Sequence, residues 1–242
     1  MKQKETSWNT QRPAEEDDNI ELSNVLIDEI GDNHIAASTD TPMKANAFDL
    51  SDDKKIAIIE KHFAAIMDTL GLDLTDDSLR GTPKRVAKMY VQEIFSGLNP
   101  VNRPAVTLFE NKYKYNQMLV EKNITFYSNC EHHFVPIYGK AHIAYISSGK
   151  VIGLSKLNRF VQYFARRPQV QERLSMQIGK ELQKILQTDN VAVVIDALHL
   201  CVSSRGVNDT SASTVTAFYG GKFNEETTKQ EFLRYLELKP EG

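Results

Sequence analysis

Both cysteines of this 242-residue chain stand beside histidines, in two segments that are far apart in the sequence. The first segment is Cys130–His133, which reads CEHH, and the second is His199–Cys201, which reads HLC. Thiolate and imidazole are the ligands that a borderline-soft cation such as zinc prefers. Cys130 and His133 stand three apart, so within a turn both side chains can reach a common point.

The second segment lies in Asn190–Val202, whose apolar residues alternate as in a strand. Period-two alternation predicts that His199 and Cys201 lie on one face of it. Cys130, His133 and Cys201 then form a candidate set of three metal ligands. Three protein ligands leave a coordination position open, which is typical of catalytic rather than structural zinc sites.

The spacing by itself leaves other interpretations open. Two cysteines in a chain of this length are often buried small hydrophobic residues. They could also form a disulfide, but the sequence shows no secretory signal and a reducing compartment disfavours that bond. Adjacent histidines are not a metal motif in themselves, because on a strand His132 and His133 would point to opposite faces.

Composition excludes several functional classes. Hydrophobic residues make up 41% and charged residues 25% of the chain, as in ordinary globular proteins. The net charge of −3 does not indicate a general nucleic-acid binder, so any anion site must be a local basic cluster. No apolar run approaches the length that spans a bilayer, and the N-terminus lacks the apolar core of a signal peptide. We therefore expect a cytoplasmic enzyme or binding protein.

Two regions differ in composition. Residues 1–50 are polar, with an acidic patch at Glu15–Asp18, and are predicted to form a flexible arm. Such an arm either binds a partner or regulator or is a simple tail. Residues 51–242 are predicted to form one catalytic domain, with helices in 51–98 and a core of sheet and helices in 115–242.

Apolar residues three and four apart predict an amphipathic helix from near Ser51 to Gly71. Thr82 and Pro83 are typical of the N-cap and first position of a second helix, which would run to Phe95. Ser155 is predicted to cap a third helix, and the last helix begins near Glu225. The predicted inner faces of the third helix and of the helix after it are Leu157, Phe160, Val161 and Phe164, then Val170, Leu174, Ile178, Leu182 and Ile185.

Strands are predicted at Met118–Tyr127, Lys140–Ile146, Asn190–Val202 and Thr214–Tyr219, with a turn after the second at Ser148 and Gly149. Strands joined through turns, with helices grouped between them, indicate an α+β domain with an antiparallel sheet and two helices packed on it.

Basic side chains gather at two predicted helix starts. Ser155, Lys156 and Arg159 could hold a phosphate, since a helix N-terminus offers free N–H groups, although a solvated helix end is an equal alternative. Arg205 follows Cys201 closely and could add a positive charge. Arg85 and Lys88 lie near the start of their helix, where the helix dipole favours anions over cations. A bound anion would offset this unfavourable interaction.

Glu172 begins the helix after Arg167-Pro168 and could accept two hydrogen bonds from a guanine-type edge, whose N–H and NH2 donors are adjacent. A first-turn glutamate is also favoured by the helix dipole alone, and spacing favours that simpler interpretation.

Five segments together resemble the GTP cyclohydrolase I family, from about Leu70 to Leu236. They are Thr82–Tyr90, Cys130–His133, Gly153–Lys156, Arg167–Arg173, and His199–Cys201 with Arg205-Gly206, and they occur in the family's order. The arm before Ser51 falls outside the resemblance.

The resemblance implies a tunnelling-type fold, in which small antiparallel sheets from several subunits join into an oligomeric barrel. It implies a homodecamer of two stacked pentamers with active sites between subunits. It also implies a role for each matching residue: zinc ligands Cys130, His133 and Cys201; acid-base pair His132 and His199; guanine contacts Gln171 and Glu172; and triphosphate contacts Ser155, Lys156, Arg159 and Arg205, with Arg85 and Lys88 of a neighbouring subunit.

The implied reaction is zinc-dependent hydrolysis of GTP at C8 of guanine, which releases formate and forms 7,8-dihydroneopterin triphosphate for tetrahydrofolate and pterin biosynthesis. Zinc lowers the pKa of bound water from about 15.7 towards ~7. Protonation of N7 by His132 would make C8 more electrophilic, and His199 would move protons in later steps.

Two alternative functions remain open. A deazaguanine reductase on the same fold would use a cysteine as nucleophile and a nicotinamide cofactor, whereas the second cysteine and the paired histidines favour a metal. A non-catalytic zinc-bound oligomer would need a fourth ligand, His132 or His199, to close the site.

Overall fold

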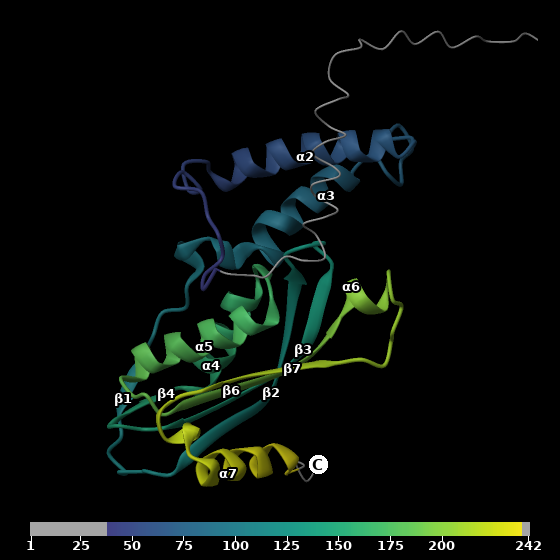
Figure 1. Cartoon of the computed structure of the whole chain (residues 1–242). Coiled ribbons are helices and arrows are strands. Elements are labelled where there is room, and N and C mark those ends of the chain that lie inside the picture. Colours follow the sequence, from purple (N-terminus) through teal and green to yellow (C-terminus); the bar gives the residue numbers. More distant parts are fainter. Residues whose placement is uncertain (1–37, 239–242) are drawn as a thin grey trace, which may run out of the picture. The chain divides into compact units, whose positions relative to one another are not determined.

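A computed structural model describes residues 38–238 of the chain. Its centre is a five-stranded sheet in the order β5-β2-β3-β6-β7 (Figure 1). The strands are β2 (Met118–Cys130), β3 (Pro136–Ile146), β5 (Pro168–Gln169), β6 (Val191–His199) and β7 (Thr214–Tyr219). The chain is therefore an α+β protein, as the sequence predicts.

The sheet is mixed rather than purely antiparallel. β2, β3, β6 and β7 pair antiparallel with their neighbours, but β5 pairs parallel to β2, through Asn129 and Cys130. A register shift between Glu121 and Ile124 interrupts the pairing of β2 with β3, and Asn123 there has a φ of 62°. A second, two-stranded sheet pairs β1 (Leu108–Glu110) with β4 (Lys150–Ile152).

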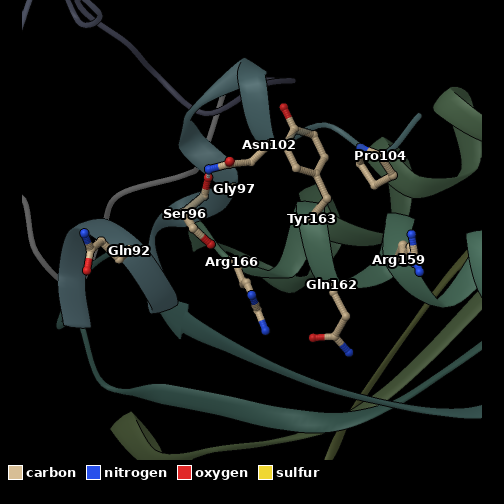
Figure 2. A pocket seen from close by; sticks show the side chains of 9 residues that line it. All are labelled: Gln92, Ser96, Gly97, Asn102, Pro104, Arg159, Gln162, Tyr163 and Arg166. Carbon is tan, nitrogen blue, oxygen red and sulfur yellow. Dashed lines mark hydrogen bonds between the residues drawn. The ribbon is translucent and has the colours of Figure 1, made fainter. Parts of the chain in front are cut away.

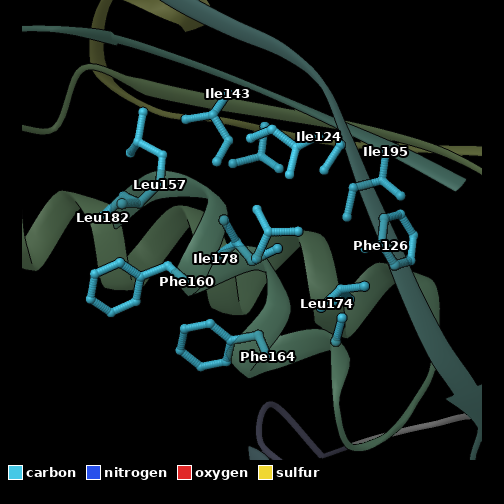
Figure 3. Close-up of a cluster of buried hydrophobic side chains, with 14 of the residues drawn as sticks. Ile124, Phe126, Ile143, Leu157, Phe160, Phe164, Leu174, Ile178, Leu182 and Ile195 are labelled. Atoms are coloured by element: carbon cyan, nitrogen blue, oxygen red, sulfur yellow. The ribbon is translucent and has the colours of Figure 1, made fainter. Parts of the chain in front are cut away.

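Two helices cover one face of the main sheet, α4 (Leu154–Ala165) and α5 (Gln171–Leu186) (Figure 1). The predicted inner faces of both helices are confirmed in their main residues: Leu157, Phe160 and Val161, then Ile178 and Leu182 are fully buried. They pack against sheet residues such as Ile124, Phe126 and Ile143 (Figure 3). Truncating one of these leucines or isoleucines to alanine costs about 2–5 kcal/mol of stability. The residues come from β2, α4 and α5, so this core holds these elements in place relative to one another.

A smaller core lies on the other face of the sheet. There η4 (Gly221–Asn224) and α7 (Glu226–Glu237) pack Phe223 and Phe232 against β-strand residues including Met118 and Val194. The two phenylalanine rings meet edge to face, with centroids 5.8 Å apart. The predicted C-terminal helix is thereby confirmed, and it serves to cover the start of β2.

The N-terminal helices are α2 (Asp52–Thr69) and α3 (Thr82–Met89), the latter continued by a π-helical turn, η1 (Tyr90–Ile94). The predicted start and stop of α2 are confirmed: the Ser51 hydroxyl caps the helix by accepting a hydrogen bond from Lys54 N, and Gly71 has a φ of 79°. The predicted N-cap Thr82 is wrong: Gly81 is the N-cap, and Thr82 and Pro83 occupy the first turn.

Short 3-10 turns, η2 (Ser96–Leu98) and η3 (Pro100–Asn102), connect these helices to the core. Gly97 lies so close to α4 that a Cβ there would stand 2.0 Å from the Tyr163 carbonyl oxygen. Its N–H donates to Arg166 O at 2.9 Å. Only glycine allows this contact, which joins the helical N-terminal part to the end of α4.

The predicted cap of α4 also differs. Gly153 is the N-cap and has no side chain to cap with, whereas Ser155 lies inside the first turn. Lys156 N donates to Gly153 O at 2.8 Å, so the main chain closes this turn. The Ser155 hydroxyl is therefore not needed to cap the helix.

The predicted arm covers residues 1–50, of which 1–37 lie outside the described residues. The described remainder contacts the core: Ser38 O accepts from Arg173 Nε at 3.0 Å, and Asp40 Oδ1 accepts from Gln177 Nε2 at 2.5 Å. Within residues 38–238, the helices are all too short or too polar to cross a bilayer. The domain boundary at residue 51 stays a prediction.

Candidate metal centre and its surroundings

The first candidate ligands lie where the chain turns from β2 into β3. Cys130 is the last residue of β2, and its N–H and C=O bond to Val135 O and Phe134 N, both at 2.9 Å. Phe134 takes up the reversal with a left-handed φ of 51°. A turn this tight brings His133 back beside Cys130, with 3.9 Å between His133 Nδ1 and Cys130 Sγ.

The second segment is reached through β6, which ends at His199 rather than at the predicted Val202. Leu200–Ser203 form a one-turn helix, α6, so Cys201 is helical and the predicted common strand face with His199 is wrong. His199 pairs with Ile137 at the start of β3, which follows the first loop directly. Strand pairing, rather than strand alternation, thus brings Cys201 to Cys130.

Ligand atoms of the three residues predicted from ligand chemistry converge. The Sγ atoms of Cys130 and Cys201 and a ring nitrogen of His133 all lie within 4.8 Å of one another. Bonds of about 2.3 Å to sulfur and about 2.1 Å to nitrogen in a tetrahedron would put such atoms roughly 3.6 Å apart. The 3.9 Å between Cys130 Sγ and His133 Nδ1 is near that value, so the donor set and its spacing suit a tetrahedral metal ion.

Two further histidines border this group. His132 Nδ1 lies 3.7 Å from Cys130 Sγ, and His132 Nε2 is 4.0 Å from a carboxylate oxygen of Glu131. His199 Nε2 lies 2.7 Å from Gln171 Oε1. Among residues 38–238, the mutually close ligand group comprises Cys130, His133 and Cys201, without either of these histidines.

Burial and nearby charges shift the pKa values of this group. Burial raises the pKa of the Cys201 thiol, Cys130 raises it further, and the Arg205 guanidinium opposes both. Burial lowers the pKa of His199, an effect that the Glu172 carboxylate partly offsets. Arg205 and Glu172 therefore act electrostatically on the same cluster. A metal ion must displace protons from these thiols in order to bind.

A charged pair beneath the loop was not singled out from the sequence. Arg173 on α5 is 4% exposed and forms two hydrogen bonds to Glu131, the residue between Cys130 and His132. Glu131 N also donates to Gln169 O at 3.0 Å. A charged residue next to a candidate metal ligand was the available signal, since such a residue must find a partner when buried.

The predicted phosphate residues lie elsewhere in the chain. α4 runs alongside β2, with Asn158 Nδ2 3.2 Å from Glu121 Oε1 and Gln162 Nε2 2.6 Å from Thr125 O. Glu121 stands nine residues before Cys130, which is roughly 25–30 Å along a strand. Ser155, Lys156 and Arg159 are therefore at the far end of β2 from the metal group of the same chain.

The other predicted cations are also separate from the metal group. Arg85 on α3 donates to Thr82 Oγ1 at 2.9 Å and to Ser78 O at 3.3 Å. Lys88 lies one turn further along the same helix. Helix α3 packs on α2 and η1 rather than on the loop that carries Cys130.

Arg159 lines a polar pocket of about 490 Å³ between η2–η3 and α4, together with Arg166, Gln162 and Gln92 (Figure 2). Two guanidinium groups and three side-chain amides offer donors, and no carboxylate of residues 38–238 lines the pocket. Such a lining suits an anionic group.

Comparison with known proteins supplies a family. The model of a family described as GTP cyclohydrolase I matches residues 59–237. A protein named GTP cyclohydrolase 1 from Flavobacterium johnsoniae is 61% identical over 213 residues, covering 88% of this chain and 96% of that one. Proteins of the same name from Salmonella arizonae and Salmonella newport are 51% identical over 207 residues, covering 85% of this chain and 93% of theirs.

Proposed function

The chain belongs to the GTP cyclohydrolase I family, and we propose on that basis that it hydrolyses GTP at C8 of guanine. The reaction releases formate and forms 7,8-dihydroneopterin triphosphate, the first step of tetrahydrofolate and pterin biosynthesis. The enzyme is then a hydrolase of cyclic amidine C–N bonds that acts in the cytoplasm. The observation that carries this proposal is the convergence of Cys130, His133 and Cys201 within a chain that matches the family over residues 59–237.

Zinc is the proposed metal. Two thiolates and an imidazole suit a borderline-soft cation better than magnesium or calcium, which take oxygen ligands. When bound by Cys130, His133 and Cys201, zinc supplies activation of a water molecule at neutral pH. The three-ligand group within 4.8 Å supports a site with one position left open.

The two histidines beside the metal group are proposed to move protons. His132 donates to N7 of guanine, which withdraws electrons from C8 and makes it more electrophilic. His199 transfers protons in the later ring opening and rearrangement. The lowered pKa of His199, caused by burial, favours its neutral form at pH 7, in which it can accept a proton.

Glu172 is proposed to recognise guanine. Its carboxylate can accept from N1–H and from the 2-amino group together, a pairing that adenine does not offer. Glu172 is exposed at the start of α5, and its effect on the pKa of His199 supports a position near the cluster. The guanine contact implied for Gln171 stays a prediction.

The triphosphate is proposed to bind Ser155, Lys156, Arg159 and Arg205, with Arg85 and Lys88 of a neighbouring subunit. Within one chain, Arg159 lies roughly 20 Å along β2 from Cys130, because Gln162, one turn further along α4, bonds to Thr125, five residues before Cys130. Each site therefore combines the metal group of one subunit with the α4 residues of another.

An oligomeric barrel, a homodecamer of two pentamers, would also complete the sheet. β7 pairs with β6 alone, and β2 pairs with β5 only at its last two residues, so in the described part of the chain each strand has an edge without a strand partner. Open edges at both ends allow copies of one sheet to join into a closed ring.

The test is a nucleotide panel on purified metal-loaded protein. GTP, ATP, GDP and dGTP are incubated separately, with and without a chelator, while formate and pterin absorbance are followed. We expect one formate per pterin from GTP, lost with the chelator and restored by zinc. A folded, zinc-loaded protein that releases no formate would overturn the proposal, and NADPH oxidation with a deazaguanine substrate would indicate the reductase instead.

A further inference from the structure

We propose that Gln171 is a positioning residue, which orients the His199 ring and determines which ring nitrogen carries the hydrogen. This rests on the proposed function, because His199 is the group through which it acts. Gln171 is the first residue of α5 and is 2% exposed. Its side chain makes three hydrogen bonds, to the two strands β6 and β7 and to His199.

The amide of Gln171 is held in one orientation. Its Nε2 lies 3.1 Å from Ile195 O and 2.7 Å from Thr214 O, and both partners are main-chain carbonyls, which can only accept. The two N–H groups of the amide must therefore point to these oxygens. A flipped amide would place its oxygen against two carbonyl oxygens, so the hydrogen-bond network itself fixes the assignment.

The fixed amide determines the state of His199. Gln171 Oε1 faces His199 Nε2 at 2.7 Å, and a carbonyl oxygen has no hydrogen to give. Nε2 must then carry the hydrogen and donate it. In the neutral ring, the lone pair is then left on Nδ1.

The same amide ties His199 to the strand that carries it. Ile195 lies four residues before His199 on β6, and Thr214 begins β7 beside it. Gln171 thus bonds to the backbone of both strands and holds the imidazole at the end of β6. The ring cannot rotate about its side-chain bonds without losing the bond to Oε1.

This arrangement gives Gln171 and the adjacent Glu172 different roles. Glu172 is exposed, whereas Gln171 is buried with its oxygen and both N–H groups already bonded. A guanine contact through the amide N–H groups of Gln171 would need one of these bonds to break, and the amide oxygen already faces His199. Glu172 can contact a substrate, and Gln171 acts on the reaction only through His199.

The experiment compares four full-length, metal-loaded proteins: wild type, Gln171→Met, His199→Ala and the double variant. Methionine keeps the length of the side chain and removes the amide. We expect Gln171→Met to lower kcat for GTP about 10- to 100-fold, as loss of a supporting hydrogen bond to an active-site histidine commonly does. In the His199→Ala background the same substitution should change kcat less than about twofold, because residues that act as one unit are not additive.

A binding measurement gives a readout that does not depend on turnover. Equilibrium dialysis of GTP against His199→Ala and against the double variant should return the same Kd. A Kd that rises on adding Gln171→Met would show a guanine contact and overturn the proposal. Independent, multiplying losses of kcat in the double variant would overturn it as well.

Two controls exclude a general loss of structure. Gln183→Met removes another α5 amide, which donates to Asp189 O at 2.8 Å away from the cluster, and it should leave kcat unchanged. An equal loss of kcat in Gln183→Met would overturn the proposal. Metal content and melting temperature are measured throughout, and Gln171→Asn, whose shorter amide does not reach His199, replaces the methionine variant if that variant does not fold.

The failure of this inference differs from failure of the proposed function. A wild-type protein that releases no formate would contradict the function. An active wild type with additive losses would contradict only the role of Gln171.

Discussion

Arg173 holds the carboxylate of Glu131 through two hydrogen bonds, from Nη1 to Oε2 at 2.5 Å and from Nη2 to Oε1 at 3.1 Å. The side chain of Arg173 is 3% exposed and that of Glu131 is 16% exposed, so the pair is largely removed from water. Glu131 lies between Cys130 and His132. The paired guanidinium on α5 therefore fixes the backbone of the loop that carries the proposed metal ligands Cys130 and His133.

Replacing Arg173 with methionine should destabilise the protein by about 3–5 kcal/mol, because it leaves the Glu131 carboxylate buried without its partner. The loop should also bind metal less tightly. Urea unfolding and zinc titration measure the two effects. Arg80→Met breaks an exposed pair with Asp77 and should change neither quantity; equal effects from both variants would contradict the prediction.

Cys201→Ser should lose the metal and GTP turnover together, since a hydroxyl is a poor ligand for zinc beside a thiolate and an imidazole. Metal analysis by atomic emission and formate release measure the two losses. Ser204→Ala removes a nearby hydroxyl that donates to Leu200 O at 2.6 Å and serves as the control. Full turnover by a metal-free Cys201→Ser protein would end the zinc proposal.

Glu172→Gln should raise KM for GTP at least tenfold while the melting temperature stays unchanged, because one acceptor becomes a donor that faces a donor of guanine. The comparison of GTP with ITP, which lacks the 2-amino group, sharpens the test. Wild type should prefer GTP, and the variant should lose most of that preference. Unchanged selectivity would remove Glu172 from the guanine site.

Two inactive variants should restore each other if each site is shared between subunits. Cys201→Ser disables the metal half, and a double variant of Lys156 and Arg159 to alanine disables the phosphate half. Random co-assembly should regain roughly a quarter of wild-type activity, since a heterologous interface joins different patches of two chains. Co-expression of Cys201→Ser with His133→Ala, which share a half, should regain none. Failure to exceed this control would place both halves in one chain.

His142 should make stability depend on pH below neutrality. Burial lowers its pKa, an effect that Asp196 opposes and Lys122 and Lys140 reinforce, and Nδ1 accepts from Asn123 N at 3.3 Å. The unfolded chain takes up a proton below about pH 6.5, whereas the folded protein resists it, so the free energy of unfolding falls as pH drops through that range towards the folded pKa. His142→Gln should flatten this fall in urea unfolding from pH 7.5 to 5; identical slopes would contradict it.

The spacing of apolar residues was sufficient to predict which side chains are buried, wherever one face of a helix or strand packs on the core. Leu157, Phe160 and Val161 follow helical spacing because α4 covers an apolar sheet, and their burial is confirmed. The end of β6 could not be predicted, because apolar residues continue to Val202 while the chain bends at Leu200. The Ser203 and Ser204 hydroxyls bond there to main-chain carbonyls four residues back, a local pairing that competes with a continued strand and that hydropathy does not report.

The site residues likewise divide into those that the sequence could predict and those that only the fold places. The identity of Cys130, His133 and Cys201 as a group follows from ligand chemistry, and their convergence is confirmed. The role of Arg173 could not be predicted, because an arginine in a helix pattern usually faces solvent, and only the fold places it under Glu131. The distance of Arg159 from the metal group likewise follows from the length of β2 rather than from any motif.

The bond from Arg173 Nε to Ser38 O also limits how far the protein can be shortened for laboratory work. A truncated version that begins at the first helix, at Asp52, would look complete by hydropathy. It would lack Ser38 and Asp40, and so leave the guanidinium under the metal loop and the amide of Gln177 without these partners. A purification tag is therefore best joined ahead of Ser38, so that the carbonyl and carboxylate stay with the catalytic unit.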